Sequence, residues 1–347
     1  MRVKGKIAEM LKGQKRHISF HTPGHKRAGA DITELSYSDN LLSPTGVIAE
    51  AERDIADILG AHKSFLLTDG STAGIFAMVY ALRAAGIQKL AVPSGSHRSV
   101  FNACRVLNVD MVPVKQVVSR GIPLQPSEEE IAAVLENADA LLLTSPDYYG
   151  FLAPLKRAKE LCRAAGKPLV VDGAHGSHLH FCDCHAGRFA DMWVDGAHKS
   201  LPALTQGAAV SAANEEWAAR LFEGVRTFRT TSPSYPVMAS VEYAFRYPRK
   251  IEIERAAQAA KQKVGAIEND DWTKLVVPFG DRAGEAQAFL EAHGIYPEFN
   301  DGNYLMFYLS PCTKKGEIKK LVKMLDTVPR GELGDGVGVI PIYSEDA

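Results

Sequence analysis

Segment 194–211, VDGAHKSLPALTQGAAVS, bears most directly on the fold, because it surrounds a lysine with small and apolar residues. Lys199 follows a histidine, and no other charged residue comes after Asp195 in this segment. We expect the Lys199 amine to be held away from bulk water, which lowers its pKa and makes it a better nucleophile toward a carbonyl group. The alternative is a lysine whose long side chain reaches out of the sheet into water.

The chain of 347 residues is long enough for about two domains. Lys and Arg number 40 against 41 Asp and Glu, a net charge of −1, which argues against nucleic acid or an anionic membrane as the main partner. No apolar run reaches the roughly 18 residues of a membrane span. Residues 1–20 contain no apolar core of signal-peptide length. We therefore expect a cytoplasmic protein without a membrane or nucleic-acid partner.

Residues 175–185, HGSHLHFCDCH, concentrate histidines and cysteines that could ligate a metal. No second ligand pair follows at zinc-finger spacing, so we expect a loop with some buried side chains and no metal site. The number of cysteines, five, is odd and does not indicate a disulfide framework.

Short apolar segments alternate with amphipathic ones between about residues 46 and 212. We expect strands over 63–68, 89–94, 111–117, 138–146 and 167–172, and helices over 47–60, 71–86, 99–107 and 154–166. This alternation predicts an α/β fold with a mainly parallel sheet that helices cover on both faces.

The pattern changes after about residue 212, where we predict a smaller α+β region. Residues 242–267 indicate one long helix, or two helices with a break near Pro248. Further strands are expected over 273–279 and 303–310, and further helices over 283–293 and 314–328. We predict three parts of the chain: an N-terminal arm at 1–45, a large domain at 46–245 and a small domain at 246–347.

Polar residues follow several predicted strands, at the edge where open parallel sheets bind ligands. Gly70, Ser71 and Thr72 come after the first strand, where hydroxyl and free N–H groups either hold a phosphate or cap the next helix. Asp172 ends a strand and either faces a ligand or caps a turn. His97 either lies on an aromatic cofactor or serves the fold alone.

A phosphate cradle, a carboxylate and a lysine in this order suit pyridoxal 5′-phosphate (PLP). The carboxylate of Asp172 would keep the pyridine nitrogen protonated, and Lys199 would bind the aldehyde. The small residues around Lys199 would leave room for the ring.

Seven segments resemble the Orn/Lys/Arg decarboxylase family, PLP enzymes of fold type I in the aspartate aminotransferase class. They are HTPGHK, LLSPTGVIAEAERDIADILGA, SHRSVFNA, TSPDYYG, VDGAHG, GAHKSLPALTQGA and TTSPSYPVMASVEYA. The likeness covers about residues 18–250. It implies a seven-stranded, mainly parallel sheet with a smaller C-terminal α+β domain, and decarboxylation of arginine, lysine or ornithine to a polyamine-type amine and CO₂.

The resemblance also implies roles for individual residues. Lys199 attaches the cofactor with His198 beside it, Asp172 pairs with the pyridine nitrogen, and His97 stacks on one ring face. Thr231 or Ser232 reaches a phosphate in the partner subunit, so the resemblance implies a homodimer with shared active sites. The implied cofactor-binding residues are Lys199, Asp172, Ala174, His175, His97, Gly70, Ser71, Thr72, His198, Thr231 and Ser232.

The sequence departs from the family's pattern in several places. Gly196 replaces a hydroxyl residue three positions before the lysine, Gly173 replaces an acid, and Asp147 replaces a neutral residue. Family members continue into a C-terminal domain with a PPGIP segment, whereas this sequence ends at Ala347 without one. We therefore expect that domain to be lacking and the substrate pocket to be incomplete or differently shaped.

The expected reaction is decarboxylation, in which His198 or Lys199 returns a proton to Cα. Asp147 and Glu298 are candidates to bind the distal cation of the substrate. One alternative is an aminotransferase, in which Arg282 or Arg330 would hold the α-carboxylate, or an amino-acid lyase. The other is a PLP-binding protein with little catalytic activity.

Overall fold

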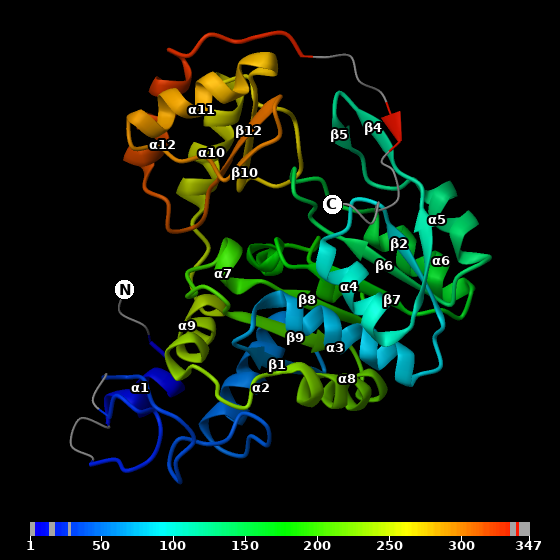
Figure 1. The fold of residues 1–347 in the computed structure, drawn as a ribbon, viewed down its shortest axis with the longest axis vertical. Coiled ribbons are helices and arrows are strands. Elements are labelled where there is room, and N and C mark those ends of the chain that lie inside the picture. The colour runs from blue at the N-terminus through cyan, green and yellow to red at the C-terminus, as the bar shows by residue number, and fades with distance from the viewer. Residues whose placement is uncertain (1–3, 14–17, 27–28, 334–337, 340–347) are drawn as a thin grey trace.

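A seven-stranded sheet runs through the larger part of the chain (Figure 1). The computed structural model describes residues 4–13, 18–26, 29–333 and 338–339. The strands of this sheet are, in spatial order, β1 (Lys63–Leu67), β9 (Ala208–Ala212), β8 (Met192–Asp195), β7 (Leu169–Gly173), β6 (Ala140–Thr144), β2 (Lys89–Pro93) and β3 (Asp110–Val114). Strand β9 is antiparallel to both of its neighbours, and the other neighbouring pairs are parallel. The predicted mainly parallel sheet is therefore confirmed.

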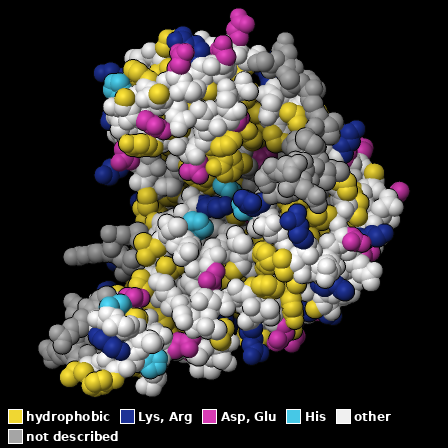
Figure 2. Space-filling model, viewed as in Figure 1, with side chains coloured by type: hydrophobic (Ala, Val, Ile, Leu, Met, Phe, Trp, Pro, Cys, Tyr) yellow, Lys and Arg dark blue, Asp and Glu magenta, His cyan; other side chains and the backbone are white. Residues whose placement is uncertain are grey.

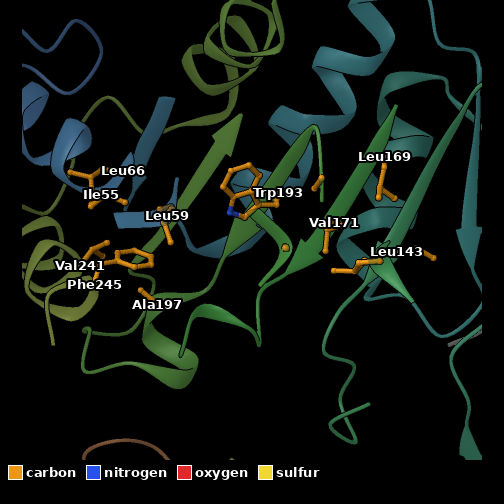
Figure 3. Packing of buried hydrophobic residues seen from close by; sticks show 14 of the residues in the cluster. Ile55, Leu59, Leu66, Leu143, Leu169, Val171, Trp193, Ala197, Val241 and Phe245 are labelled. Atoms are coloured by element: carbon orange, nitrogen blue, oxygen red, sulfur yellow. The ribbon is translucent and has the colours of Figure 1, made fainter. Parts of the chain in front are cut away.

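Helices cover both faces of this sheet, as the sequence predicts (Figure 1). They are α2 (Val47–Leu59), α3 (Gly70–Ala84), α4 (Arg98–Leu107), α5 (Glu128–Leu135), α6 (Leu155–Ala164), α7 (Ala197–Ser200), α8 (Glu215–Phe228) and α9 (Tyr235–Phe245). Successive strand residues point to opposite faces, so Val170 packs in a core with α3, α4 and α8, while Val171 packs in another with α2, α6 and α9. Figure 3 shows the second core around the fully buried Trp193.

Local sequence signals explain where several helices begin and end. Gly60 ends α2 with a φ of 66°, a left-handed conformation that glycine adopts without steric cost. Ser127 and Glu130 form a reciprocal capping box at the start of α5. Pro248 lies between α9 and α10, so segment 242–267 contains a break and not one continuous helix.

The C-terminal part builds a separate antiparallel sheet and a core of its own. The sheet joins, in order, β10 (Lys274–Pro278), β12 (Tyr304–Tyr308) and β11 (Phe299–Asn300). The helices are α10 (Ile251–Lys263), α11 (Ala283–Ala292) and α12 (Lys315–Leu325). Their buried side chains form one cluster with those of the strands, such as Leu275 and Phe307. This separate core supports the division into 1–45, 46–245 and 246–347, which we propose as the domain organisation.

The remaining elements are short. Helix α1 (Lys6–Lys12) packs against α2 and α9. Strands β13 (Gly338–Val339), β4 (Val117–Ser119) and β5 (Ile122–Pro123) form a third sheet. The described residues also form the 3₁₀ turns η1 (Ser177–Phe181), η2 (Ala186–Arg188) and η3 (Gly280–Arg282). Within the described ranges, no helix combines the length and apolar character that crossing a membrane requires.

Candidate active site

A pocket of about 370 Å³ lies at the carboxyl ends of β6, β7 and β8. It is lined by Gly70, Ser71, Thr72, Ile75, Gly95, His97, Ser99, Thr144, Tyr148, Asp172, Ala174, His175, His198 and Lys199. In Figure 2, basic and histidine side chains gather where the small part meets the large one. The pocket brings together every predicted cofactor-binding residue apart from Thr231 and Ser232.

Lys199 lies in the short helix α7, which a single residue, Gly196, separates from the end of β8. Its Nζ is 3.1 Å from Nε2 of His175. Burial lowers the pKa of Lys199, although the charges of Asp172 and Glu298 raise it. These surroundings match the shielded lysine that segment 194–211 predicts.

Asp172 lies near the end of β7, and its side chain is buried at the base of the pocket. Its Oδ1 accepts a hydrogen bond from the backbone N–H of Ala174 at 3.1 Å, which fixes the carboxylate. Ala174 itself presents only a methyl group to the pocket, so a flat ring can approach Asp172.

One corner of the pocket has the properties of an anion site. Ser71 and Thr72 lie in the first turn of α3, after Asp69, and not at the helix cap as the sequence suggested. Free N–H groups at the start of a helix attract anions. The Ser71 hydroxyl is buried and has no hydrogen-bond partner among the described residues, a costly arrangement unless a ligand supplies one. This corner therefore fits a phosphate group.

Gly196 lies against this corner, and close packing explains why it is a glycine. A Cβ at this position would be 2.4 Å from the carbonyl oxygen of Ala174 and 2.9 Å from Oγ of Ser71. Likewise, a Cβ at Gly173 would be 2.9 Å from the carbonyl oxygen of Val194. The side chains that the family usually has at these two positions would need the backbone to shift.

Two further histidines are fixed at the pocket wall. Nδ1 of His97 accepts a hydrogen bond from the N–H of Ser99 at 3.2 Å, which caps α4. Nδ1 of His198 donates to the carbonyl oxygen of Gly207 at 2.9 Å. Burial lowers the pKa of both histidines. Each ring is therefore held in place and favours its neutral form.

The two acids predicted to meet a substrate cation lie in different places. The carboxylate of Asp147 accepts hydrogen bonds from the N–H of Phe151 at 2.9 Å and from Gln125 at 3.1 Å, and it does not line the pocket. Burial raises the pKa of Asp147 to about 6. Glu298, in contrast, accepts a hydrogen bond at 3.2 Å from the hydroxyl of Tyr148, which does line the pocket. The structure thus brings Glu298, and not Asp147, beside the pocket.

The other predicted residues lie away from the pocket of this chain. Thr231 and Ser232 are exposed on the segment between α8 and α9. Arg282 pairs with Glu285 at 2.8 Å. Arg330 donates hydrogen bonds to backbone carbonyl groups of the small part. Among the described residues, no group of three or more metal-ligating side chains is placed to hold an ion.

The sequence analysis did not single out Lys274, Tyr148 or Tyr308, which surround His175. Lys274 begins the apolar strand β10, and all of its side chain is buried. The same reasoning that identified Lys199, a lysine inside an apolar segment, could have identified it. The two tyrosines carry no comparable signal, because aromatic residues are common in buried strands and loops.

The fold places the chain in a structural class. The Francisella novicida lysine decarboxylase aligns with a TM-score of 0.80 over 92% of this chain and 59% of that chain, at 18% sequence identity. The serine palmitoyltransferase of Sphingomonas wittichii aligns with a TM-score of 0.67 over 82% of this chain and 76% of that chain, at 17% identity. This is the fold of the type-I PLP enzymes. The chain spans about three-fifths of the length of the lysine decarboxylase.

The chain belongs to the Orn/Lys/Arg decarboxylase family, because the model of the family's major domain matches residues 24–270. The arginine decarboxylase of Halalkalibacterium halodurans is 28% identical, over 89% of this chain and 73% of the relative. PLP is the cofactor of this family, and the pocket contains the carboxylate, lysine and anion corner that fit it.

Proposed function

We propose that the protein decarboxylates a basic amino acid, arginine, lysine or ornithine, and releases CO₂ and a polyamine-type amine. One observation carries the proposal: Lys199, Asp172 and the anion corner at Ser71 and Thr72 converge on a single pocket. These are the groups that bind the amine-reactive, ring-nitrogen and phosphate ends of PLP. The family supplies the reaction class.

Each residue has a defined part in this proposal. Bound in the pocket, PLP supplies a sink for the electron pair that stays on Cα when the α-carboxylate leaves as CO₂. Lys199 attaches the cofactor, and Asp172 holds the proton on its ring nitrogen. His198 or Lys199 then gives Cα the proton that replaces the carboxylate.

The position of Glu298 supports the proposal that the substrate is a basic amino acid. Its carboxylate lies beside the pocket, where Tyr148 donates a hydrogen bond to it. A carboxylate in this position can form a charge-assisted hydrogen bond with the distal cation of the substrate. We therefore assign Glu298 to substrate recognition and leave Asp147 as a structural residue of its loop.

The positions of two arginines favour decarboxylation over transamination. An aminotransferase needs a cation that holds the α-carboxylate in the plane of the ring. Arg282 and Arg330, the candidates for that role, form their contacts with Glu285 and with backbone carbonyl groups of the small part. Neither lines the pocket.

A homodimer with shared sites is part of the same proposal. Thr231 and Ser232 are exposed in this chain and precede the apolar helix α9. Exposed hydroxyl groups can donate hydrogen bonds to a phosphate in a second subunit. We propose that they complete the anion corner of the partner's pocket.

Product analysis tests this function. Protein loaded with PLP is incubated with arginine, lysine or ornithine, and CO₂, amine and keto acid are measured beside a Lys199→Ala control. We expect CO₂ and amine from one of the three and no keto acid. Keto acid without CO₂ would indicate an aminotransferase, and bound PLP with no product would indicate a binding protein.

A further inference from the structure

Lys274 is a second buried lysine beside the pocket, and the function proposed above gives it no role. It begins β10 in the small part of the chain. Its Nζ lies 3.1 Å from Nδ1 of His175, 3.9 Å from Oδ2 of Asp271 and 3.4 Å from the ring centre of Tyr308. Removing an ammonium group from water is costly, so a lysine at this position depends on such partners.

His175 connects this lysine to the proposed cofactor lysine. Its Nε2 is 3.1 Å from Nζ of Lys199, and its Nδ1 is 3.1 Å from Nζ of Lys274. Burial, together with the two lysine charges, lowers the pKa of His175 well below its usual value. The imidazole is therefore neutral, with one nitrogen that donates and one that accepts.

Counting donors shows that the two lysines cannot both be charged in this arrangement. An ammonium group has three donors and no acceptor. Two charged lysines would need His175 to accept at both nitrogens, and a neutral imidazole accepts at one. Both hydrogen bonds exist together only when one lysine is an uncharged amine that accepts the imidazole N–H.

Asp271 determines which lysine keeps the charge. Burial alone would raise the pKa of Asp271, but His178 and Lys274 lower it, so the carboxylate is ionised. Its Oδ2 has no hydrogen-bond partner among the described residues, and the charge of Lys274 balances it at 3.9 Å. Burial and the neighbouring lysine lower the pKa of Lys274 to about 7, so its charge depends on Asp271, which opposes the shift. Lys274 has this carboxylate at 3.9 Å and the ring of Tyr308 at 3.4 Å, whereas among the described residues no carboxylate forms an ion pair with Lys199. These contacts assign the charge to Lys274 and the neutral amine to Lys199.

We propose that Lys274, acting through His175, keeps Lys199 in the uncharged form that attacks the aldehyde of PLP. The ammonium of Lys274 donates to Nδ1 of His175, which places the imidazole proton on Nε2, and Nε2–H donates to the lone pair of Lys199. In the attachment step, the Lys199 nitrogen bonds to the aldehyde carbon, and its two protons leave with the aldehyde oxygen as water. Lys274 is a positioning residue, and the inference rests on the role proposed for Lys199.

Several other charged or titratable groups act on the two lysines. Asp172 on β7 and Glu298 before β11 act on Lys199. Lys199 in turn interacts electrostatically with His97 before α4, His198 on α7, His175 after β7 and Lys274 on β10. Asp147 and Asp271 also act on Lys274. None of the variants below changes a group in these two sets except Lys274 and His175.

The experiment measures how fast Lys199 reacts with PLP as a function of pH. PLP is removed from the full-length protein and added back, the visible absorbance is followed, and borohydride reduction with peptide mapping locates the attached PLP. In Lys274→Met, we expect the pH midpoint of the reaction rate to rise by about one unit, a roughly tenfold slower attachment at neutral pH. Lys274→Arg keeps the charge and should restore most of the rate.

His175→Met provides a second test that leaves Lys274 and Asp271 in place. It should raise the midpoint by a similar amount, and the double variant should shift no further than either single one, because both act through the same contact. If Lys274→Met does not fold, the shift in His175→Met decides the question. An unchanged midpoint in a folded Lys274→Met protein, or additive shifts in the double variant, would overturn the inference.

Lys261→Met is the matched control. Lys261 is another buried lysine of the small part that donates to the backbone oxygen of Asp271 at 2.7 Å and to Asn269. Its loss should lower the melting temperature without moving the midpoint. Attachment of PLP to a lysine other than Lys199 in the unaltered protein would contradict the proposed function, which separates that failure from a failure of this inference.

Discussion

Lys199 and Lys274 approach the same imidazole from two different sheets. Lys199 follows a strand of the large sheet and lines the open pocket, whereas Lys274 begins a strand of the small sheet and is fully buried. The large sheet therefore supplies the groups that meet a ligand, because the carboxyl ends of its strands converge there. The small sheet supplies Lys274, whose ammonium charge is buried away from water.

A similar contrast exists between two aspartates on neighbouring strands. Asp172 and Asp195 lie near the carboxyl ends of β7 and β8. The carboxylate of Asp195 accepts hydrogen bonds from Nε2 of His185 at 3.1 Å and from the indole N–H of Trp193 at 3.0 Å. These contacts stabilise the fold. The carboxylate of Asp172 lines the pocket. Position at the end of a strand is thus not enough to define a functional acid.

The largest expected effect concerns the pocket's dependence on a second subunit. A Lys199→Ala chain and a chain with both Thr231→Ala and Ser232→Ala should each be inactive. In a hybrid dimer with shared sites, one pocket carries both defects and the other carries neither. Mixing equal amounts should therefore restore about a quarter of the full activity.

Decarboxylation assays before and after subunit exchange measure this recovery, and a mass-tagged subunit verifies the exchange. Activity that stays at the parental level, after proven exchange between two inactive parents, would show that Thr231 and Ser232 serve their own chain.

Asp172→Asn should reduce turnover strongly while PLP stays bound. A neutral amide cannot hold the proton on the pyridine nitrogen, so a loss of about 3–4 kcal/mol of transition-state stabilisation is expected, roughly 10²–10³-fold in kcat. Absorbance quantifies the bound PLP, and steady-state kinetics give the turnover.

Asp195→Asn is the comparison for this variant. It should lower the melting temperature by breaking the contacts with His185 and Trp193, with turnover per folded molecule close to normal. Near-normal turnover in Asp172→Asn would remove Asp172 from its proposed role.

Glu298→Gln should weaken the binding of a basic substrate more than it slows the reaction. Losing the carboxylate removes a charge-assisted contact with the distal cation, so KM should rise about tenfold with a small change in kcat. Initial-rate measurements with the preferred amino acid give both constants. Asp301→Asn is the control, because Asp301 accepts a hydrogen bond from Tyr149, which does not line the pocket, whereas the partner of Glu298, Tyr148, does. An equal KM effect in both variants would contradict the assignment of Glu298.

The smallest expected effect concerns the loop at Asp147, which meets the small part through hydrogen bonds from residues 270 and 271 to Gly150. Burial raises the pKa of Asp147 from 3.8 to about 6, so its protonated form is favoured in the folded state. Its contribution to stability is therefore present below about pH 4 and is lost as the pH rises through about 6.

Denaturant unfolding across that window compares the natural protein with Asp147→Asn. The free energy of unfolding of the natural protein should fall relative to that of the variant as the pH rises from about 4 to about 6. Parallel pH profiles for the two proteins would contradict the shifted pKa.

Hydrophobic periodicity and turn residues predicted most of the strands and helices of the large region. The alternation of short apolar strands with helices indicated the parallel sheet, and polar residues after the strands indicated Asp172 and the corner at Ser71. These signals are local, so a single sequence contains them. Resemblance to a family then supplied the roles that position alone left open, as Asp195 illustrates.

The contribution of the small region could not be predicted in the same way. Lys274 reaches His175 only after β10 packs beside the pocket, a contact between residues 99 positions apart. The packing that requires glycine at position 196 also depends on two distant segments, around Ala174 and Ser71. Such long-range contacts leave no periodic signal in the chain, so they were found only in the folded structure.

Mapping the covalent site of PLP tests the central claim most directly. The protein is loaded with PLP, reduced with borohydride, digested and analysed by mass spectrometry. We predict that the reduced cofactor is attached to Lys199 alone. Lys274, which is fully buried beside His175, should be unmodified. A label on Lys274 or on any other lysine would contradict the account of which lysine meets the cofactor and which one carries the buried charge.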